Sequence, residues 1–460
     1  MKAILTILLC LCLAVPAHAQ ELKPRLVVLT DIAPASIEPD DMESMVRLMT
    51  YADQIEIEAL ITTIGWNCDP YPTEWADSLW RVINAYEHDV KNLMKRSGQK
   101  KFMPLNAEQG QQAIGYWPSA DYLRSRVAMG SQRAGIGVIG KDNRTPGSDL
   151  IIQLVDEDDP RPLWIASWGG ANTLSQAIWQ VKQERTPEQL SAFLKKLRVY
   201  TITDQDMVYG MRMNRSYSSH QWLRREFARD LLFIWDESAW LSQNELGKNH
   251  WSVYAKMIQG HGALGKAYPT FKWGVEGDTP SWLNILPYGL HDADDPQQVG
   301  WAGCFKRDMC PDSLTVAWTN WRSPQKGISG EYEIQFYDDT FRDFSARIEW
   351  AEKGKGNRNP IVDINGTRGS IPIYVTASKG ETFVIDASGS YDPDGDALDF
   401  NWWIQRDAGN CPQHVQLNTQ DAKASLTIPS ETPCEIHVVC EVRDHGHIPL
   451  VGYRRIVIKN

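Results

Sequence analysis

The chain is 460 residues long, carries a formal net charge of −11 at pH 7 and contains 19 tryptophans and 16 tyrosines. An acidic chain without a basic stripe has nothing with which to neutralise a phosphate backbone, which argues against nucleic acid as its partner. The length allows two or three domains, and the many aromatic rings favour a carbohydrate ligand, although large aromatics are also ordinary core residues.

The N-terminal segment has the pattern of a cleavable signal peptide. MKAILTILLCLCLAVPAHAQ begins with a basic residue at Lys2, continues with an apolar run and ends with the small residues AHA before Gln20. We therefore expect a signal peptide over residues 1–19 and an exported protein, periplasmic or secreted. Neither Cys10 nor Cys12 is placed like the lipid-carrying cysteine of a lipoprotein, and no later apolar run is long enough to span a bilayer. The pattern thus favours a soluble exported form without membrane insertion.

Residues 29–41, LTDIAPASIEPDD, gather three carboxylates at one predicted strand-to-helix turn. Asp40 and Asp41 open a predicted helix, where acidic residues favour the positive end of the helix dipole and cap free N–H groups. Capping does not explain Asp31, which ends the predicted strand and so lies at the carboxyl edge of a sheet. Three carboxylates repel one another unless a cation or protons offset them, and oxygen ligands suit Ca²⁺ or Mg²⁺. A hard-metal site and a structural cap both stay open.

Between residue 24 and about residue 236, β-rich runs alternate with segments of helical period. In DDMESMVRLMTYA, for example, Met42, Met45 and Met49 recur at three- and four-residue steps and mark one apolar face. The expected strands are 25–31, 55–65, 162–170, 197–203 and 230–236, and the expected helices are 40–52, 73–86, 148–157 and 173–183. Such alternation predicts an α/β fold with a mostly parallel sheet flanked by helices.

The pattern changes after about residue 355, where KGKGNRNP has the composition of a linker. Short strands separated by turn signals follow, and they predict an all-β sandwich of the immunoglobulin-like kind. The expected strands are 371–378, 381–388, 398–405, 424–430, 434–444 and 453–460. We therefore expect one domain over residues 20–355 and a second over residues 356–460.

The stretch YDPDGD in the second domain carries Asp392, Asp394 and Asp396 around a glycine. Such a stretch can ligate Ca²⁺, but Asp-Pro-Asp-Gly is also an ordinary turn sequence. Because no distal glutamate follows at the spacing that a bidentate ligand requires, the turn is the favoured interpretation.

Six cysteines lie outside the predicted signal peptide, and an oxidising compartment permits them to form disulfides without requiring it. Cys304 with Cys310, and Cys411 with Cys434 or Cys440, are candidate pairs by proximity in the chain, but sequence does not determine connectivity. A zinc site is disfavoured because no pair has C-x₂-C spacing.

Polar residues stand at four predicted strand ends or loops that meet at one edge of the sheet. They are the three aspartates at 31, 40 and 41, Asn67 in TTIGWN, Asn172 in GGANT and Asp278 in GDTPSW. These segments, LTD…PDD, TTIGWN, WGGANTLSQA and GDTPS, resemble the four signature segments of nucleoside hydrolases, in the same order. The resemblance covers roughly residues 24–320, and the two-domain layout resembles an exported bacterial nucleoside-hydrolase-like family known as cellulose-binding.

The resemblance implies a role for each matching residue. Asp31 would ligate Ca²⁺ and act as base toward a water held by the metal, and Asp40 would bond sugar hydroxyls and touch the metal. The ligand set implied for Ca²⁺ is Asp31, Asp40, Asp41, the backbone carbonyl of Trp168, and Asp278. The substrate-binding residues expected are Asp40, Asn67 and Asn172. Together these groups suit hydrolysis of a bond at an anomeric carbon with inversion.

The sequence also departs from nucleoside hydrolases. The loop between Asp31 and Asp40 is longer, Leu29 replaces the first aspartate of the usual Asp-x-Asp, and Gly277 stands where many members have a histidine that helps the purine leave. If the leaving group is a sugar oxygen instead, another acid must serve. The candidates are Glu276, Asp204 and Asp206, each of which also suits a solvated or capping role. Trp66 and Trp168 flank the expected pocket and suit either sugar stacking or core closure.

The leading hypothesis is an exported calcium-dependent glycoside hydrolase that acts on or binds plant-type polysaccharide fragments. One alternative is an N-ribohydrolase of nucleosides, against which Gly277 argues. The other is a non-catalytic carbohydrate-binding protein that keeps the metal as a scaffold, which the retained Asp31 weakly opposes. For the glycoside hydrolase and for the binding protein, the expected partner is a carbohydrate. The sequence leaves open whether the chain forms a homo-oligomer.

Overall fold

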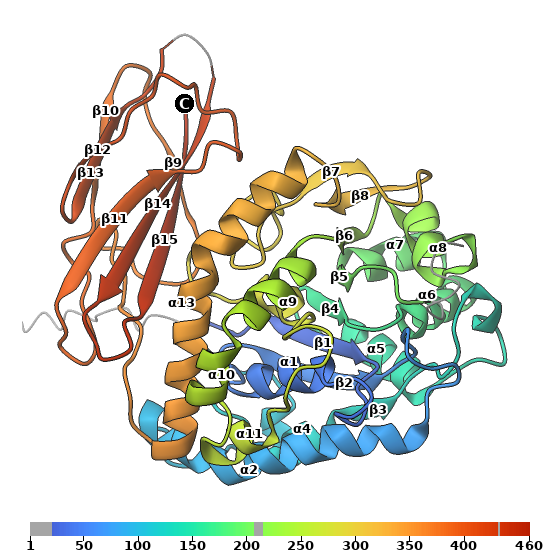
Figure 1. Cartoon of the computed structure of the whole chain (residues 1–460). Coiled ribbons are helices and arrows are strands. Elements are labelled where there is room, and N and C mark those ends of the chain that lie inside the picture. The colour runs from blue at the N-terminus through green and yellow to red at the C-terminus, as the bar shows by residue number, and fades with distance from the viewer. Residues whose placement is uncertain (1–20, 207–214, 431–432) are drawn as a thin grey trace, which may run out of the picture.

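The computed structural model describes residues 21–206, 215–430 and 433–460, and Figure 1 shows two parts, a large sheet-and-helix domain and a smaller all-β domain. The predicted signal peptide, residues 1–19, lies outside these described residues. Within them, no helix is both long and apolar enough to cross a membrane.

The large domain is built on an eight-stranded sheet of order β3-β2-β1-β4-β5-β6-β8-β7. The strands are β1 Arg25–Thr30, β2 Glu56–Thr62, β3 Val127–Met129, β4 Leu163–Ser167, β5 Leu197–Ile202, β6 Leu232–Asp236, β7 Lys306–Met309 and β8 Val316–Thr319. Only the β7–β8 edge pair is antiparallel. Every residue of β1 and β2 is buried, as expected for strands covered on both faces.

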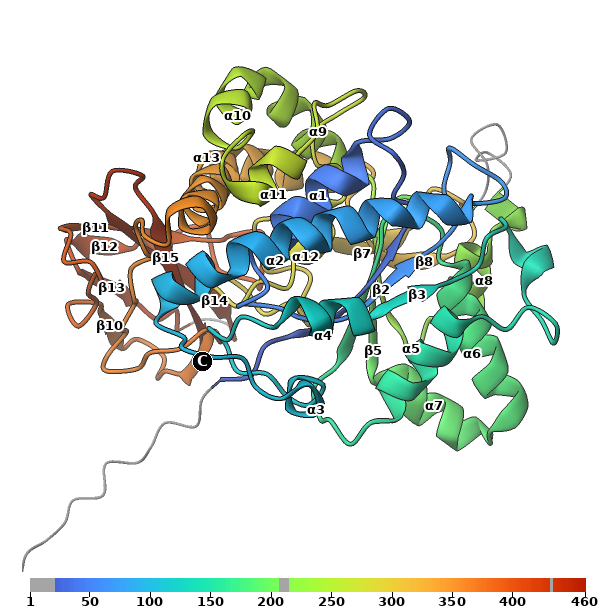
Figure 2. The same ribbon diagram turned by 90° about the horizontal axis from the view of Figure 1, so that it is seen from below.

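Helices cover both faces of this sheet, so the predicted α/β fold is confirmed (Figure 2). On one face, the apolar side chains of α1 and α2 pack with those of α12 and α13. On the other face α5, α6, α7 and α8 form a second core with the strands. The helices are α1 Asp40–Met49, α2 Asp77–Ser97, α3 Leu105–Glu108, α4 Ala120–Ser125, α5 Pro146–Asp156, α6 Asn172–Glu184, α7 Pro187–Lys195, α8 Ser219–Phe227, α9 Ala239–Asn249, α10 Trp251–Met257, α11 Gly262–Ala267, α12 Thr279–Leu283 and α13 Gln325–Lys353.

The C-terminal part consists of two β-sheets around a third core. One sheet has the order β10-β13-β12 and the other β11-β14-β15-β9, and all pairs are antiparallel except β15–β9. The strands are β9 Ile373–Thr376, β10 Thr382–Asp386, β11 Leu398–Ile404, β12 Asn418–Gln420, β13 Lys423–Thr427, β14 Glu435–Asp444 and β15 Val451–Lys459. The predicted second, all-β part is therefore present.

The two parts share a packed interface along α13. Val439, Val451 and Tyr453 of the second part belong to the same core cluster as α13 and the large sheet. Arg443 forms a two-pronged ion pair with Asp339 of α13, with nitrogen–oxygen distances of 2.6 and 2.9 Å. The helix ends before Gly354, whose φ of 63° is left-handed, a conformation that glycine adopts without strain.

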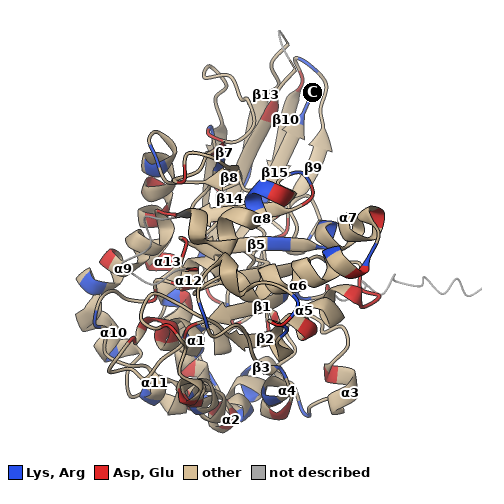
Figure 3. Cartoon of the chain, turned by 90° about the vertical axis from the view of Figure 1, so that its right-hand side faces the viewer, with Lys and Arg blue, Asp and Glu red and all other residues tan. Residues whose placement is uncertain are grey.

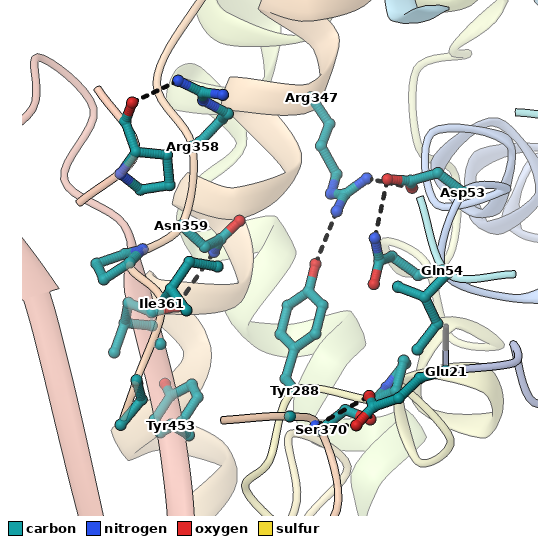
Figure 4. A pocket seen from close by; sticks show the side chains of 18 of the residues that line it. Glu21, Asp53, Gln54, Tyr288, Arg347, Arg358, Asn359, Ile361, Ser370 and Tyr453 are labelled. Atoms are coloured by element: carbon teal, nitrogen blue, oxygen red, sulfur yellow. Dashed lines mark hydrogen bonds and ion pairs between the residues drawn. The ribbon is translucent and has the colours of Figure 1, made fainter. Parts of the chain in front are cut away.

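A cavity of about 340 Å³ opens at this junction (Figure 4). Inside it, Arg347 of α13 donates to Asp53 at 2.7 Å and to the Tyr288 hydroxyl at 3.0 Å, and Ser370 bonds Glu21. Arg347 and Asp53 are thus paired with each other inside the cavity, which is the pattern of a structural junction.

The six cysteines of the described residues are free thiols. Cys304 packs in the core on one face of the large sheet and Cys310 in the core on the other, which explains why this candidate pair does not join. Cys411, Cys434 and Cys440 all lie in the core of the second part without forming a bond. Lysines and arginines are spread over many elements and do not gather on one (Figure 3).

Candidate functional site

A pocket of about 390 Å³ lies where β1 and β5 end and α1 begins. Its wall combines carboxylates, amides and tryptophans from segments far apart in the chain. The lining residues are Asp31, Glu38, Asp40, Asp41, Trp66, Asn67, Ile202, Thr203, Gln205, Trp240, Asn244, Trp273 and Asp278. All of them belong to the large domain. The structure therefore brings together five of the residues that the sequence singles out for their side chains, the four aspartates and Asn67.

Asp31 is held against two glycines that the chain needs at these positions. A Cβ atom on Gly65 would stand 1.6 Å from Asp31 Oδ2, and one on Gly169 would stand 2.8 Å from Asp31 Oδ1. Both glycines follow strand ends of the sheet, at the edge where α/β folds bind their ligands. Any larger residue at either position would push the Asp31 carboxylate out of its place.

Asp40 and Asp41 occupy the first turn of α1, whose N-cap is Pro39 with no side-chain cap. Neither aspartate acts as the N-cap residue, so the structural-cap interpretation explains them only through the helix dipole. Asp41 instead accepts a short hydrogen bond from the hydroxyl of Thr30, and Asp40 accepts one from the backbone N–H of Gly277 at 2.5 Å. The two side chains thus tie α1 to the end of β1 and to the loop before α12.

Burial raises the pKa values of all four aspartates, and neighbouring carboxylates add to the rise. Burial raises the pKa of Asp31 well above its usual value, and the charges of Asp41 and Glu38 add to this effect. Burial likewise raises the pKa of Asp278, again with help from Asp41 and other carboxylates. The pKa of Asp41 rises to about 7 for the same first reason, although the bond from Thr30 opposes the rise. The repulsion among such carboxylates is relieved when they bind protons or a cation.

Ca²⁺ fits the chemistry of this donor set, because every group is an oxygen ligand and four aspartates gather in one pocket. The side chains as they stand are engaged elsewhere: the Trp168 carbonyl accepts a short bond from the amide of Gln205, and Asp41 holds Thr30. Within the part of the chain that the structure describes, no group of three or more His, Cys, Asp or Glu is arranged to hold a metal ion.

Two predicted residues lie outside the pocket. Asn172 is fully buried, bonds the carbonyl of Arg133 and accepts from the Thr63 hydroxyl at 3.0 Å, so the structure does not place it at the substrate wall. The Trp168 side chain is also fully buried and donates to the Ser281 hydroxyl at 2.7 Å. It closes the core, and only its backbone carbonyl faces toward Gln205 of the wall.

The three candidate proton donors are likewise absent from the wall. Glu276 is fully buried, pairs with Arg47 at 2.6 Å and accepts from the Tyr268 hydroxyl at 2.7 Å. Asp204 accepts from the Ser218 hydroxyl at 2.8 Å, and Asp206 accepts from backbone N–H groups, including that of Gly135 at 3.0 Å. All three are buried and bonded inside the fold, so none of them has the solvated role that was the alternative.

The structure adds Glu38, a carboxylate that sequence analysis passes over although it precedes Asp40 by two residues. Glu38 lines the pocket and accepts from the Asn67 amide at 2.6 Å. The signal in the sequence is the run IEPDD, in which three acids follow a loop.

Three tryptophans line the same pocket, and only Trp66 is expected from the sequence. Trp240 and Asn244 are one helical turn apart on α9, so they share a face of that helix. Trp273, on the loop after α11, is 64% exposed, the highest value among the tryptophans of the described residues. An exposed ring at the rim of a polar pocket is available for stacking on a sugar.

The comparisons with known proteins agree with this architecture. Residues 25–305 match the family described as cellulose-binding Sde182, nucleoside hydrolase-like domain, and residues 382–460 match the family described as cellulose-binding protein Sde0182, C-terminal domain. A solved structure of a nucleoside hydrolase-related hypothetical protein from Saccharophagus degradans, associated with carbohydrate metabolism, is 33% identical with a TM-score of 0.78. The match covers 95% of this chain and 99% of that chain. No curated protein matches.

Two solved structures of effector proteins are far more distant. XOO4466 and XopQ, the latter complexed with adenosine diphosphate ribose, are each 10% identical with a TM-score of 0.31. The matches cover 69% and 72% of this chain and 95% and 94% of theirs, and at this similarity they carry no argument. The two family matches and the 33% identical structure together decide the question: this chain belongs to the cellulose-binding Sde182 family, with its nucleoside hydrolase-like domain and its C-terminal domain.

Proposed function

We propose that this protein is an exported calcium-dependent glycoside hydrolase acting on plant-type polysaccharide fragments. The observation that carries the proposal is the pocket itself, in which buried carboxylates at the sheet edge stand beside three tryptophans. Carboxylates suit chemistry at an anomeric carbon, and aromatic rings suit the sugar. The family's printed description as cellulose-binding and the carbohydrate association of the solved relative support a sugar polymer as the substrate.

Asp31 is the proposed base. It is buried, fixed between Gly65 and Gly169, and faces the other aspartates, so its carboxylate is oriented before substrate arrives. A bound Ca²⁺ would supply the positive charge that orients a water and favours its deprotonation. Asp31, Asp40, Asp41, Asp278 and the backbone carbonyl of Trp168 would hold the ion. Asp31 would accept a proton from the attacking water while the water oxygen bonds to the anomeric carbon. The bond from that carbon to the leaving oxygen would break, and the leaving oxygen would take a proton from Glu38, which is single displacement with inversion.

The rest of the wall would position the sugar. Glu38 and Asn67 bond each other at 2.6 Å on the pocket wall and offer a carboxylate and an amide to sugar hydroxyls. Asp40, held by Gly277, adds a further acceptor. Glu38 is also the acidic side chain of the wall outside the proposed ligand set, which makes it the group to contact a leaving oxygen. Trp273 at the rim and Trp66 and Trp240 within would stack on the ring faces.

The leading alternative of another class is a non-catalytic sugar-binding protein with the same pocket. It predicts binding without turnover. An N-ribohydrolase is the second alternative, but no histidine is among the described residues that line the pocket, so a protonated imidazole for a purine is missing there.

The deciding experiment is release of reducing sugar by the mature protein, with Ca²⁺, from cello-oligosaccharides, other plant-wall oligosaccharides and nucleosides. We expect release from an oligosaccharide, and Asp31→Asn to lower it by roughly 10²- to 10⁴-fold, as for loss of a general base. Asp399→Asn, which makes the same change at a side chain 73% exposed on the second domain, is the matched control.

A rim variant separates sugar contact from chemistry. Because Trp273 is largely exposed, Trp273→Ala should change the free energy of unfolding by no more than about 0.5 kcal/mol and raise KM several-fold with little change in kcat. Release from nucleosides alone would establish the N-ribohydrolase, and sugar binding without release from any substrate would establish the binding protein. Either result rejects the glycoside hydrolase.

A further inference from the structure

Two aspartates far apart in the chain meet at one corner of the C-terminal part. Asp392 lies in the turn before β11, and Asp444 is the last residue of β14. The first residue of β11, Leu398, pairs directly with Asp444 across the sheet. The turn that carries Asp392 therefore arrives beside the end of the strand that carries Asp444.

In each of these carboxylates one oxygen is bonded by the fold and the other is not. Asp392 Oδ1 accepts from the backbone N–H groups of Asp394 at 2.7 Å and Asp396 at 3.1 Å. Asp444 Oδ1 accepts from the Asn357 amide at 2.8 Å and from the N–H groups of Gly446 and Leu450 at 2.9 and 3.1 Å. Each Oδ1 atom is thus fully used in shaping a turn.

The Oδ2 atoms of both residues are buried and have no hydrogen-bond partner among the residues that the structure describes. The two residues are only 8% and 1% exposed, so bulk water does not satisfy these atoms. A buried carboxylate oxygen without a partner is unfavourable, because it has lost its hydration without gaining a hydrogen bond. Two such atoms at one corner call for a positively charged ligand.

The chain itself does not provide that charge. Within the described ranges, neither Asp392 nor Asp444 forms an ion pair, whereas the nearby Arg96 and Arg358 both pair with Asp394, at 2.6 and 2.8 Å. Burial raises the pKa of Asp444, and the charge of Asp392 is among the causes that raise it further, which is consistent with their proximity. The corner therefore keeps a negative charge that its arginines leave unbalanced.

We propose that Asp392 Oδ2 and Asp444 Oδ2 bind a Ca²⁺ ion at this corner. Ca²⁺ accepts six to eight oxygen ligands in flexible geometry, so backbone carbonyls of the turn and waters can complete the shell around two carboxylates. The turn sequence alone disfavours such a site because no distal glutamate follows it. The fold removes that objection, since the second carboxylate comes from β14, about 50 residues downstream by sequence number.

The ion would also fasten the junction of the two parts. Asn357 and Arg358 of the segment after α13 both bond to this corner, through Asp444 and through Asp394, whose Oδ2 accepts from the Arg358 backbone N–H at 2.9 Å. By holding Asp392 and Asp444 together, the ion would keep the turn and the strand end to which this segment bonds in one arrangement. We therefore expect Ca²⁺ to slow proteolysis after Lys353, Lys355 and Arg358 in the intact protein.

The test is the number of Ca²⁺ ions bound per chain, measured by equilibrium dialysis with the mature protein. Asp392→Asn and Asp444→Asn should each lose one ion and the protection of the junction, whereas Asp399→Asn, an exposed neighbour on β11, should lose neither. Asp392 lies in a surface turn, so its variant remains informative if Asp444→Asn does not fold. Replacement of Ca²⁺ by Mg²⁺ should not restore protection, because Mg²⁺ demands stricter geometry.

The Asp41→Asn variant separates this site from the pocket. If the pocket also binds Ca²⁺, the native chain holds two ions and Asp41→Asn holds one. If the pocket binds none, the native chain holds one ion that Asp392→Asn removes, and this proposal stands while the proposed function fails. Unchanged Ca²⁺ binding in both Asp392→Asn and Asp444→Asn, or no binding by the native chain at millimolar Ca²⁺, overturns it.

Discussion

At the residue scale, glycines set how closely the backbone approaches the pocket carboxylates. Gly277 shows this most clearly. A Cβ atom there would stand 2.7 Å from Asp40 Oδ2 and 3.0 Å from Asn244 Oδ1, both closer than ordinary contact. The position that holds a histidine in many nucleoside hydrolases thus has no room for a side chain here. The backbone N–H of Gly277 donates to Asp40 at this same close approach.

Gly277→Ala should therefore act on the pocket more than on the fold. The added methyl group displaces Asp40, and a misplacement of about 1 Å in an active site costs roughly 100-fold in rate. We expect a drop of that order in kcat/KM for sugar release with the far-ultraviolet circular dichroism unchanged.

Gly327→Ala is the matched control, because a Cβ atom at that position on α13 meets nothing within 4 Å. Equal activity of Gly277→Ala and the native protein would show that Asp40 does not need its present position.

Sequence analysis finds the pocket residues that carry a local signal and misses those that do not. Asp31, Asp40 and Asp41 stand at a strand-to-helix turn, whose place at the sheet edge follows from the alternating pattern. Trp240 and Trp273 reach the pocket through α9 and a loop, and no local pattern indicates where those segments pack. Asn172 fails for the opposite reason. It has a suggestive motif, but its amide is used inside the fold.

At the element scale, the strands of the large sheet are predicted well because buried parallel strands are continuous apolar runs. Helix α13, Gln325–Lys353, is not among the predicted elements. It contacts α2, α9 and α11 of the large domain and, on another side, the second part. Its buried residues therefore include polar ones such as Asp339, Asp343 and Arg347 and do not form one apolar stripe. A helix that is covered on more than one side lacks the single apolar stripe from which a helix is predicted.

The same arrangement predicts what happens when the second part is removed. A chain ending at Lys355 loses Val439, Val451 and Tyr453 from the core around α13 and leaves Asp339 without Arg443. We expect its Tm to fall by roughly 5 °C or more. The pocket lies wholly in the first domain, so sugar release per folded molecule should persist.

The control for the shortened chain is the full-length protein cleaved at the single peptide bond after Lys355. Its two parts keep their interface, so they should elute together and retain most of the native Tm. A native Tm for the shortened chain would mean that the second part is an independent attachment and not a brace for α13.

At the scale of the whole molecule, a histidine near the contact of the two parts links stability to pH. His291 is 9% exposed, and its Nε2–H donates to the carbonyl of Asn284 at 2.7 Å. Burial lowers its pKa, the bond to Asn284 opposes this shift, and the charge of Arg455 from β15 adds to it. The net result is a pKa of about 4. In the unfolded chain the pKa of histidine is about 6.5. The folded protein therefore keeps this ring neutral at pH values where the unfolded chain is protonated.

The direction of the effect follows from proton binding. Between pH 6.5 and 4 the unfolded state binds more protons at this residue than the folded state, so its contribution to stability falls as the pH falls. A difference of about 2.5 pKa units corresponds to roughly 3 kcal/mol when the pH reaches 4. Buried acids with raised pKa values, such as Glu333 at about 7, act in the opposite direction over the same range. The pH dependence of the free energy of unfolding therefore contains both effects. The contribution of the histidine is isolated by comparing the native protein with a variant that lacks it.

His291→Gln supplies that difference, because glutamine retains an amide N–H for the carbonyl of Asn284 but does not titrate. The variant should lose some stability at every pH, since the ring packs closely against Gly300. The difference in free energy of unfolding between the native protein and the variant should shrink by up to about 3 kcal/mol as the pH falls from 7 to 4. Urea unfolding at each pH measures this difference. A constant gap between the two proteins over this range would show that His291 binds protons equally in the folded and unfolded chains, so that burial does not lower its pKa.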